Sequence, residues 1–74
     1  MRAVVYDYSK LVGKIKEKFG TQEKFADALD LGRVSLSLSL NSKREFSQKE
    51  INSAIELLNL EKTDIPEYFF KEKV

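Results

Sequence analysis

One segment of this sequence, residues 33–40, has the local pattern of a β-strand although its neighbours have the pattern of helices. Its apolar and polar residues alternate at a period of two, and the apolar set is Val34, Leu36, Leu38 and Leu40. No second strand pattern exists in the 74 residues to pair with it. A lone strand would leave its backbone N–H and C=O groups without hydrogen-bond partners. We therefore predict a helix over residues 33–40 and an all-helical fold.

The N-terminal part of the chain carries the clearest helix pattern. Five apolar residues recur at helical spacing and form one face: Tyr8, Leu11, Val12, Ile15 and Phe19. Either Asp7 or Ser9 is expected to cap the start of this helix. Gly20 follows the pattern directly, and it is expected to end the helix in the left-handed conformation that glycine adopts readily.

A second helix is predicted to begin at Thr21, which is a favourable N-cap residue, and to end near Asp30. Ala26 lies in the middle of this helix, where a small side chain permits two helices to cross closely. Leu31 and Gly32 then form a tight turn. Gly32 is expected to let the next helix begin without a side-chain clash.

The strongest start signal in the chain comes later. Ser47 and Glu50 have the spacing of a capping box, and Phe46 and Ile51 have the spacing of a hydrophobic staple. A short fifth helix is predicted in the tail, where a proline is tolerated in the first turn. The sequence thus predicts a compact domain of four to five helices that spans residues 1–74.

Composition narrows the functional classes. The chain has no cysteine and no histidine, so disulfides, thiolate metal sites and the commonest general base are excluded. No enzyme activity, cofactor or metal is expected. No apolar run approaches the length of a membrane helix, which is about 18 residues, and the start of the chain lacks the pattern of a signal peptide. We therefore expect a cytoplasmic protein with no membrane partner.

The charges are distributed unevenly along the chain. The first 49 residues contain ten Lys/Arg against six Asp/Glu, which gives +4, and the remaining 25 contain three against six, which gives −3. These sum to the overall charge of +1. A basic N-terminal part and an acidic C-terminal part are compatible with one face of the protein that contacts phosphate.

The stretch from Thr21 to Ser37 resembles the helix-turn-helix of Cro/repressor-type phage regulators. Residues 40–44 resemble the usual end of that motif, where glycine most often stands in place of Ser42. The similarity is greatest to short phage regulators of Gram-positive hosts that carry Tyr-Phe-Phe near the C-terminus, here residues 68–70. The resemblance implies a lambda-repressor-like fold with a helix-turn-helix over about residues 21–41.

The resemblance also implies sequence-specific binding of a double-stranded DNA operator by a transcription regulator of phage or prophage type, in the cytoplasm of a bacterial host. The helix over residues 33–40 would lie in the major groove, with Arg33 reading guanine and Val34 meeting a thymine methyl group. Gln22 would bind a phosphate, and the residues after the helix would hold the DNA backbone. The expected DNA-contacting set is Thr21, Gln22, Arg33, Val34, Ser35, Ser37, Asn41, Lys43 and Arg44.

Position 39 departs from the family pattern. An apolar core residue often stands there, whereas this chain has Ser39. Leu38 then either faces the core instead or is exposed. The rotation of the third helix about its axis, and which of Ser35 and Ser37 points outward, are therefore left open by the sequence.

A small module of this kind binds DNA weakly alone, so a homodimer on the operator is expected. The apolar tail supplies candidate dimer contacts: Ile65, Tyr68, Phe69 and Phe70. Phe69 could instead complete the small core. The apolar segment Val4, Val5 and Tyr6 is a second candidate, either packing on the domain or forming an ordered arm.

A second hypothesis keeps the fold and changes the target. The chain could be a protein-interaction module that binds another regulator through an apolar face of Leu38, Tyr68 and Phe70. The near-neutral net charge and the serine-rich, lysine-free helix over residues 33–40 favour this reading. It predicts that duplex DNA is not shifted at low salt.

Overall fold

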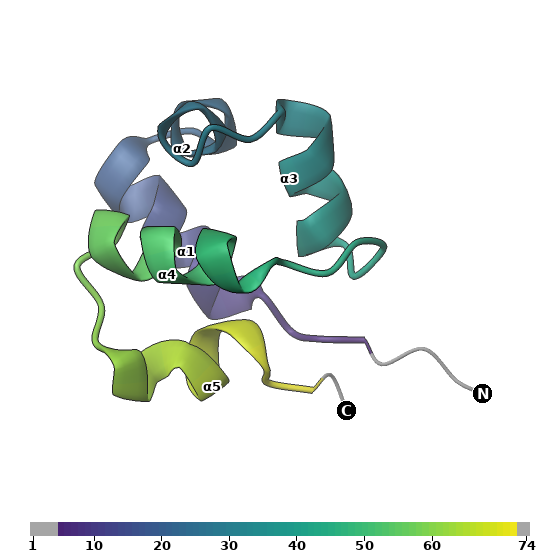
Figure 1. The fold of residues 1–74 in the computed structure, drawn as a ribbon, viewed down its shortest axis with the longest axis vertical. Coiled ribbons are helices and arrows are strands. Elements are labelled where there is room, and N and C mark those ends of the chain that lie inside the picture. The colour runs from purple at the N-terminus through teal and green to yellow at the C-terminus, as the bar shows by residue number, and fades with distance from the viewer. Residues whose placement is uncertain (1–4, 73–74) are drawn as a thin grey trace.

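Five α-helices and one short 3-10 turn make up the regular structure of residues 5–72, the part of the chain described by the computed structural model (Figure 1). Their bounds are α1 Ser9–Phe19, α2 Gln22–Ala28, α3 Arg33–Leu40, α4 Gln48–Leu57, η1 Lys62–Asp64 and α5 Ile65–Phe69. Within the described range, β-type pairing is limited to one isolated antiparallel bridge between Tyr6 and Glu72. The predicted all-α fold is confirmed. Val4 lies outside the described residues.

The segment with the strand-like pattern is a helix, and the burial of its side chains follows a helical period. Leu36 is fully buried and Leu40, one turn later, is partly buried against the core. Ser39 is buried on the same side. A strand would have sent Leu36, Leu38 and Leu40 to one side together, but Leu38 is exposed. The tertiary environment therefore overrides the local alternation.

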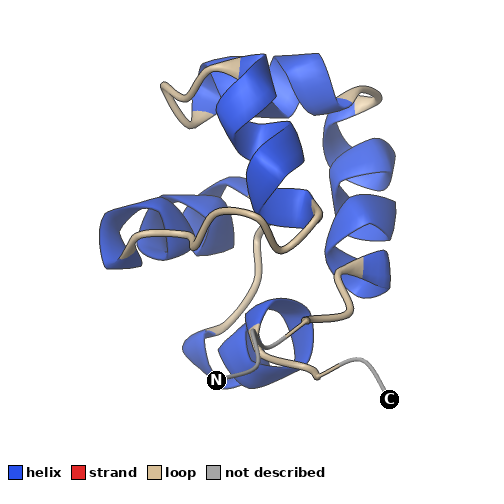
Figure 2. Cartoon of the chain, turned by 90° about the vertical axis from the view of Figure 1, so that its right-hand side faces the viewer, coloured by secondary structure: helices blue, strands red, loops and turns tan. Residues whose placement is uncertain are grey.

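The helices surround one core (Figure 1). Helix α1 packs against α2 and α5, α2 packs against α3, and α4 packs against α5. Figure 1 shows α2 end-on and α3 from the side, so these two helices cross, with the buried Ala26 in α2. Figure 2 views the same chain from the α3 side. No helix in residues 5–72 has both the length and the apolar character needed to cross a bilayer.

The predicted N-terminal caps of α2 and α4 are present. The Thr21 hydroxyl accepts the Lys24 N–H at 3.2 Å, and Ser47 and Glu50 form the reciprocal capping box at the start of α4. At α1 the N-cap residue is Tyr8, not Asp7 or Ser9, and its side chain makes no capping bond. The Asp7 carboxylate, one residue earlier, accepts the N–H of Ser9 at 2.9 Å. Each of these bonds satisfies a donor that a helix start leaves without an intrahelical partner.

The helix C-termini show a feature that the sequence pattern did not reveal. Asp30, Ser42 and Asn59 all have positive φ, between 58° and 60°, although none is glycine. Each follows a helix and is accompanied by the long-range closing bond of a Schellman motif. These bonds are all 2.9 Å long: Leu31 N–H to Ala26 O, Lys43 N–H to Leu38 O and Leu60 N–H to Ile55 O. The left-handed geometry at Ser42 explains why glycine suits that position.

The expectation for Gly32 was wrong. A Cβ added there would meet its nearest neighbour, the Ser35 hydroxyl, at 4.0 Å, and its φ of −65° suits any residue. Glycine is therefore not required at the start of α3. Gly20 is different. An added Cβ would meet nothing within 4 Å there, but the backbone φ of +83° is one that residues with a side chain rarely adopt. Its requirement comes from the backbone, as predicted.

Serine substitutions at these two glycines separate the two cases. Gly20→Ser should lower the free energy of unfolding by about 1 kcal/mol, because a side chain is strained at positive φ. Gly32→Ser should raise it by a few tenths of a kcal/mol, up to about 1 kcal/mol, because serine is a good N-cap and stiffens the unfolded chain. Urea denaturation followed by circular dichroism measures both. Equal effects at the two sites would contradict this account.

Candidate interaction surface on α3

The rotation of α3, left open by the sequence, is fixed by its buried residues. Leu36 and Ser39 face the core and Ser35 is half-buried. The exposed residues share the opposite side of the helix and its C-terminal end, and we call them the α3 face: Arg33, Val34, Ser37, Leu38 and Asn41. Ser37 therefore points outward and Ser35 does not.

Polar groups of the α3 face are held locally. The Arg33 guanidinium lies 3.4 Å from the Glu23 carboxylate of α2, with both side chains about two-thirds exposed or more. Asn41 Nδ2 donates to the Ser37 carbonyl at 2.8 Å. An ion pair this exposed contributes little to stability and exchanges readily for another partner. The Arg33 side chain is thus available to a binding partner.

Two apolar side chains stand on this surface one helical turn apart. Val34 is 70% exposed and Leu38 is 40% exposed. Single exposed apolar residues are ordinary, but residues at i and i+4 adjoin each other on a helix. Val34 and Leu38 therefore form a short apolar ridge along α3.

The remaining residues of the expected DNA-contacting set are distributed around this face. Gln22 is the exposed first residue of α2, and Lys43 is exposed in the loop after α3. The Thr21 hydroxyl is used to cap α2. These residues belong to the two crossing helices and the loop that follows, so the fold places them on neighbouring elements.

Arg44 has a different environment from the one expected. Its Nη2 donates to Glu50 Oε2 at 2.8 Å, and its Nη1 donates to Glu50 Oε1 at 3.0 Å and to Ser39 Oγ at 2.9 Å. The side chain of Arg44 is only 32% exposed, and that of Glu50 is 16% exposed. The guanidinium is therefore engaged within the protein, and we leave Arg44 out of the binding surface.

Charge along the two crossing helices is balanced. Residues 21–45 contain four basic residues, Lys24, Arg33, Lys43 and Arg44, and four acidic ones, Glu23, Asp27, Asp30 and Glu45. The surplus of the N-terminal part lies instead in α1, which has four lysines against one glutamate. Two of those lysines are paired, Lys10 with Glu67 at 2.7 Å and Lys14 with Glu17 at 3.7 Å. The positive charge thus does not concentrate on the α3 face.

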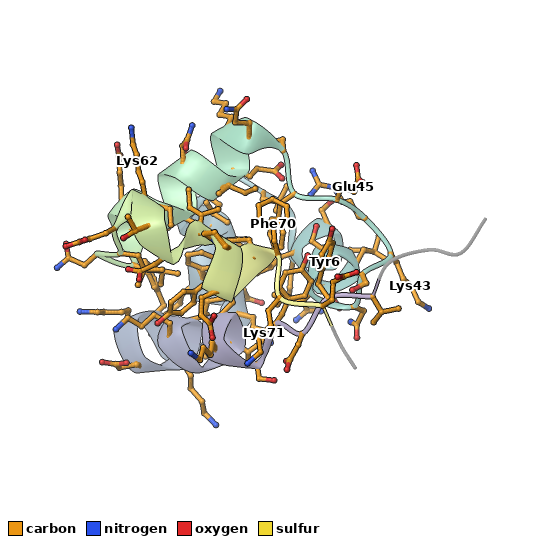
Figure 3. All side chains as sticks on the ribbon, turned by 90° about the horizontal axis from the view of Figure 1, so that it is seen from below. Tyr6, Lys43, Glu45, Lys62, Phe70 and Lys71 are labelled. Carbon is orange, nitrogen blue, oxygen red and sulfur yellow. The ribbon has the colours of Figure 1, made fainter. Side chains whose placement is uncertain are left out.

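The two ends of the described chain meet on another surface, around Val5, Tyr6 and Phe70, which we call the chain-end surface. The Asp7 N–H donates to the Lys71 carbonyl and the Tyr6 N–H donates to the Ser42 hydroxyl at 3.1 Å. The rings of Tyr6 and Phe70 lie edge to face, 5.8 Å apart, side by side in Figure 3. A cavity of about 440 Å³ opens here, lined by Tyr6, Tyr8, Ser42, Lys43, Arg44, Glu45, Phe46, Ile51, Phe69 and Phe70.

The expected dimer contacts separate by burial. Phe69 is 1% exposed and belongs to the core, so it is not available to a partner. Ile65 and Tyr68 are half-buried against the core, whereas Phe70 is 49% exposed. Tyr6 packs against the core, which agrees with one of the two expectations for the segment of Val4, Val5 and Tyr6. The second hypothesis placed Leu38 on one apolar face with Tyr68 and Phe70. Leu38 is not among the residues that line the cavity beside Phe70, and its exposed apolar neighbour is Val34 on α3.

This is a small helical protein: five helices surround one core, and α3 carries an exposed apolar ridge. The chain belongs to the family described as a protein of unknown function (DUF739), whose model matches residues 4–72. The solution structure of the modulator of repression (MOR) of the temperate bacteriophage TP901-1 from Lactococcus lactis is similar to it, with 50% sequence identity and a TM-score of 0.78. That match covers 89% of each chain. No curated protein matches the chain.

This similarity confirms the predicted resemblance to a phage regulatory protein. The solved relative is named as a modulator of repression, so the Cro/repressor type in particular stays a prediction. The sequence had no signal that distinguished a modulator from a repressor, because both readings rest on the same helical pattern.

The Glu50 carboxylate gives the chain a predictable acid sensitivity. Hydrogen bonds from the Arg44 guanidinium, and to a smaller extent from the Ser47 backbone N–H, hold the pKa of Glu50 below its usual range. A carboxylate with a lowered pKa stabilises the fold above its unfolded value, about 4.3, and loses that contribution as the pH falls through the folded value. Glu50→Gln should therefore flatten the fall in the free energy of unfolding below about pH 4.3.

The measurement is a set of urea denaturations between neutral and acidic pH. Glu56→Gln, at an exposed glutamate of the same helix α4, is the control and should retain the wild-type slope. An unchanged slope in Glu50→Gln would show that this carboxylate does not carry the acid sensitivity.

Proposed function

We propose that this protein is a phage or prophage regulator that acts by binding another regulator protein, and that it does so through the α3 face. The observation that carries the proposal is the exposed ridge of Val34 and Leu38 on helices with no surplus of positive charge. The proposed role is one of binding rather than catalysis, in the cytoplasm of a bacterial host.

The charge balance supports a protein target over a nucleic acid. Binding to duplex DNA depends on Lys and Arg that displace counterions from phosphates. Residues 21–45 are neutral overall, Arg44 is engaged by Glu50, and Arg33 stands beside Glu23. A surface of this kind has little long-range attraction for a polyanion.

The apolar ridge supports the same reading. Protein interfaces have an apolar centre and a polar rim. On the α3 face, Val34 and Leu38 would form the centre, while Ser37, Asn41 and Arg33 would form the rim. The groups around the ridge suit a partner surface that is itself apolar and carries a carboxylate to replace Glu23 at Arg33.

The relative of solved structure supports the choice of partner. It is named as a modulator of repression, and it shares half of its sequence with this chain over 89% of each. A protein that modulates repression has a repressor as its natural target. We therefore propose that the partner is the repressor of the phage or prophage that encodes this chain.

Matched aspartate substitutions test the proposal. Val34→Asp should weaken binding to the repressor by roughly tenfold or more, because it places a charge at the centre of the interface. It should not destabilise the fold, since residue 34 lies in the first turn of α3, where a negative charge is favourable. Val5→Asp makes the same change at a 50% exposed valine of the chain-end surface and should leave binding unchanged.

Isothermal titration of each variant with the purified repressor measures the affinities, and thermal unfolding checks the folds. Failure of the wild-type chain to bind the repressor would overturn the proposal. Loss of binding in Val5→Asp, with Val34→Asp unaffected, would move the interface to the chain-end surface.

Direct DNA binding, as a homodimer on an operator, is the second candidate. The observation that favours it is the placement of Gln22, Arg33, Ser37, Asn41 and Lys43 on two crossing helices and the loop that follows. In this candidate α3 would enter the major groove and Arg33 would contact a base.

Gel shifts at low salt with the intergenic duplex beside the gene decide between the candidates. We expect no shift by this chain alone. If it shifts the duplex, Arg33→Ala should reduce the affinity and relax the preference for one sequence over random duplex. A shift that disappears in Arg33→Ala would establish the second candidate in place of the first.

A further inference from the structure

The two ends of α3 are held in different ways. In residues 5–72, side chains of α3 are hydrogen-bonded outside their own helix at two points. At the N-terminal end Arg33 contacts Glu23 at 3.4 Å, on the surface. At the C-terminal end Ser39 accepts a bond from Arg44 at 2.9 Å, and Ser39 is fully buried. The well-made contact is thus at the end of α3 that leads into the loop.

Ser39 needs this contact because of its burial. A buried hydroxyl without a partner costs free energy comparable to a lost hydrogen bond, and no buried side-chain polar atom is left without a partner in the described residues. The Arg44 guanidinium reaches Ser39 from the loop, five residues further along the chain. The polar residue at this core position and the arginine in the loop therefore form one unit.

The Glu50 carboxylate holds the other side of that guanidinium. Both oxygens of Glu50 accept from Arg44, and the same carboxylate also accepts the Ser47 N–H at 2.9 Å to close the capping box of α4. The first turn of α4, the loop and the last turn of α3 are thus joined through one planar guanidinium. A bidentate arginine–carboxylate pair fixes direction as well as distance.

We infer that Arg44 is a positioning residue, which with Glu50 and Ser39 holds the last turn of α3 against the start of α4 and so fixes how the α3 face is presented to its partner. The part of this inference that concerns the partner rests on the proposed function. Arg44 itself does not contact the partner in this account. Its effect on binding passes through the backbone of residues 38–43.

Three substitutions separate this role from general stability. Arg44→Met keeps the length of the side chain and removes the donors. Glu50→Gln removes the charge opposite Arg44 and retains the capping box, because glutamine also serves at that position. Lys10→Met is the matched control: it removes a cation from the pair with Glu67, which links α1 to α5 and is about half exposed on both sides.

Amide hydrogen exchange followed by NMR measures the positioning directly. The reporters are the amides of Ser42 and Lys43, which bond to the Ser39 and Leu38 carbonyls at 3.1 and 2.9 Å. Arg44→Met should raise their exchange rates by roughly tenfold or more beyond any change in the amides of α1. Glu50→Gln should have the same pattern with a smaller amplitude, and Lys10→Met should leave these two reporters unchanged.

A uniform rise in exchange across α1, α3 and α4 would overturn the inference, because Arg44 would then act only on global stability. An unchanged exchange pattern in both Arg44→Met and Glu50→Gln would also overturn it. If Arg44→Met does not fold, Glu50→Gln with its retained capping box provides the same comparison.

Repressor affinity is measured on the same samples. An affinity that falls in Arg44→Met and Glu50→Gln but not in Lys10→Met supports the whole inference. Loosened Ser42 and Lys43 amides together with unchanged affinity would retain the positioning role and overturn the proposal that the α3 face binds the partner. The two failures are thus distinguished.

Discussion

The bidentate pair between Arg44 and Glu50 determines how this small protein places α3. Helix α3 is eight residues long, too short to be stable alone, and it packs against α2. The C-terminal end of α3 depends on Arg44, which is held by the Glu50 carboxylate. The same carboxylate closes the capping box at the start of α4. Because Ser39 is polar and buried, the contact is also a requirement of the core. Folding of α3, the loop and α4 is therefore linked through one group.

Aromatic packing closes this small core beside the loop that carries Arg44. Phe46 stands between Tyr8 and Phe69, with ring centroids 5.6 and 5.3 Å away and nearly perpendicular rings in both pairs. Rings bury a large apolar area each, and edge-to-face pairs add to that area. A chain of this length has few residues with which to build a core, so the tail must contribute to it. Phe69 is consequently a core residue, and Phe70, the next residue, is half exposed.

The fold alone does not choose between DNA and protein as the target. Two crossing helices with an exposed second helix suit either one, because the same architecture presents a helix to a groove or to a flat surface. The choice depends on the residues that the fold exposes. Here the exposed side of α3 combines an apolar ridge with balanced charge, and Arg44, the arginine of the loop after α3, is engaged by Glu50. These are properties of side chains and their partners.

The sequence by itself determined the helical class, the caps of α2 and α4 and the approximate ends of the helices, because these depend on neighbours within one turn. Thr21, Ser47 and Glu50 act as their local pattern predicted. The tertiary structure alone decided the rotation of α3, the engagement of Arg44 and the burial of Phe69. Each of these depends on a partner distant along the chain or on competition for the core, and a local pattern holds no information about either. Residues 33–40 show both parts: the lack of a partner strand in the sequence predicted the helix despite the strand-like alternation, and burial of Leu36 and Ser39 decided its rotation.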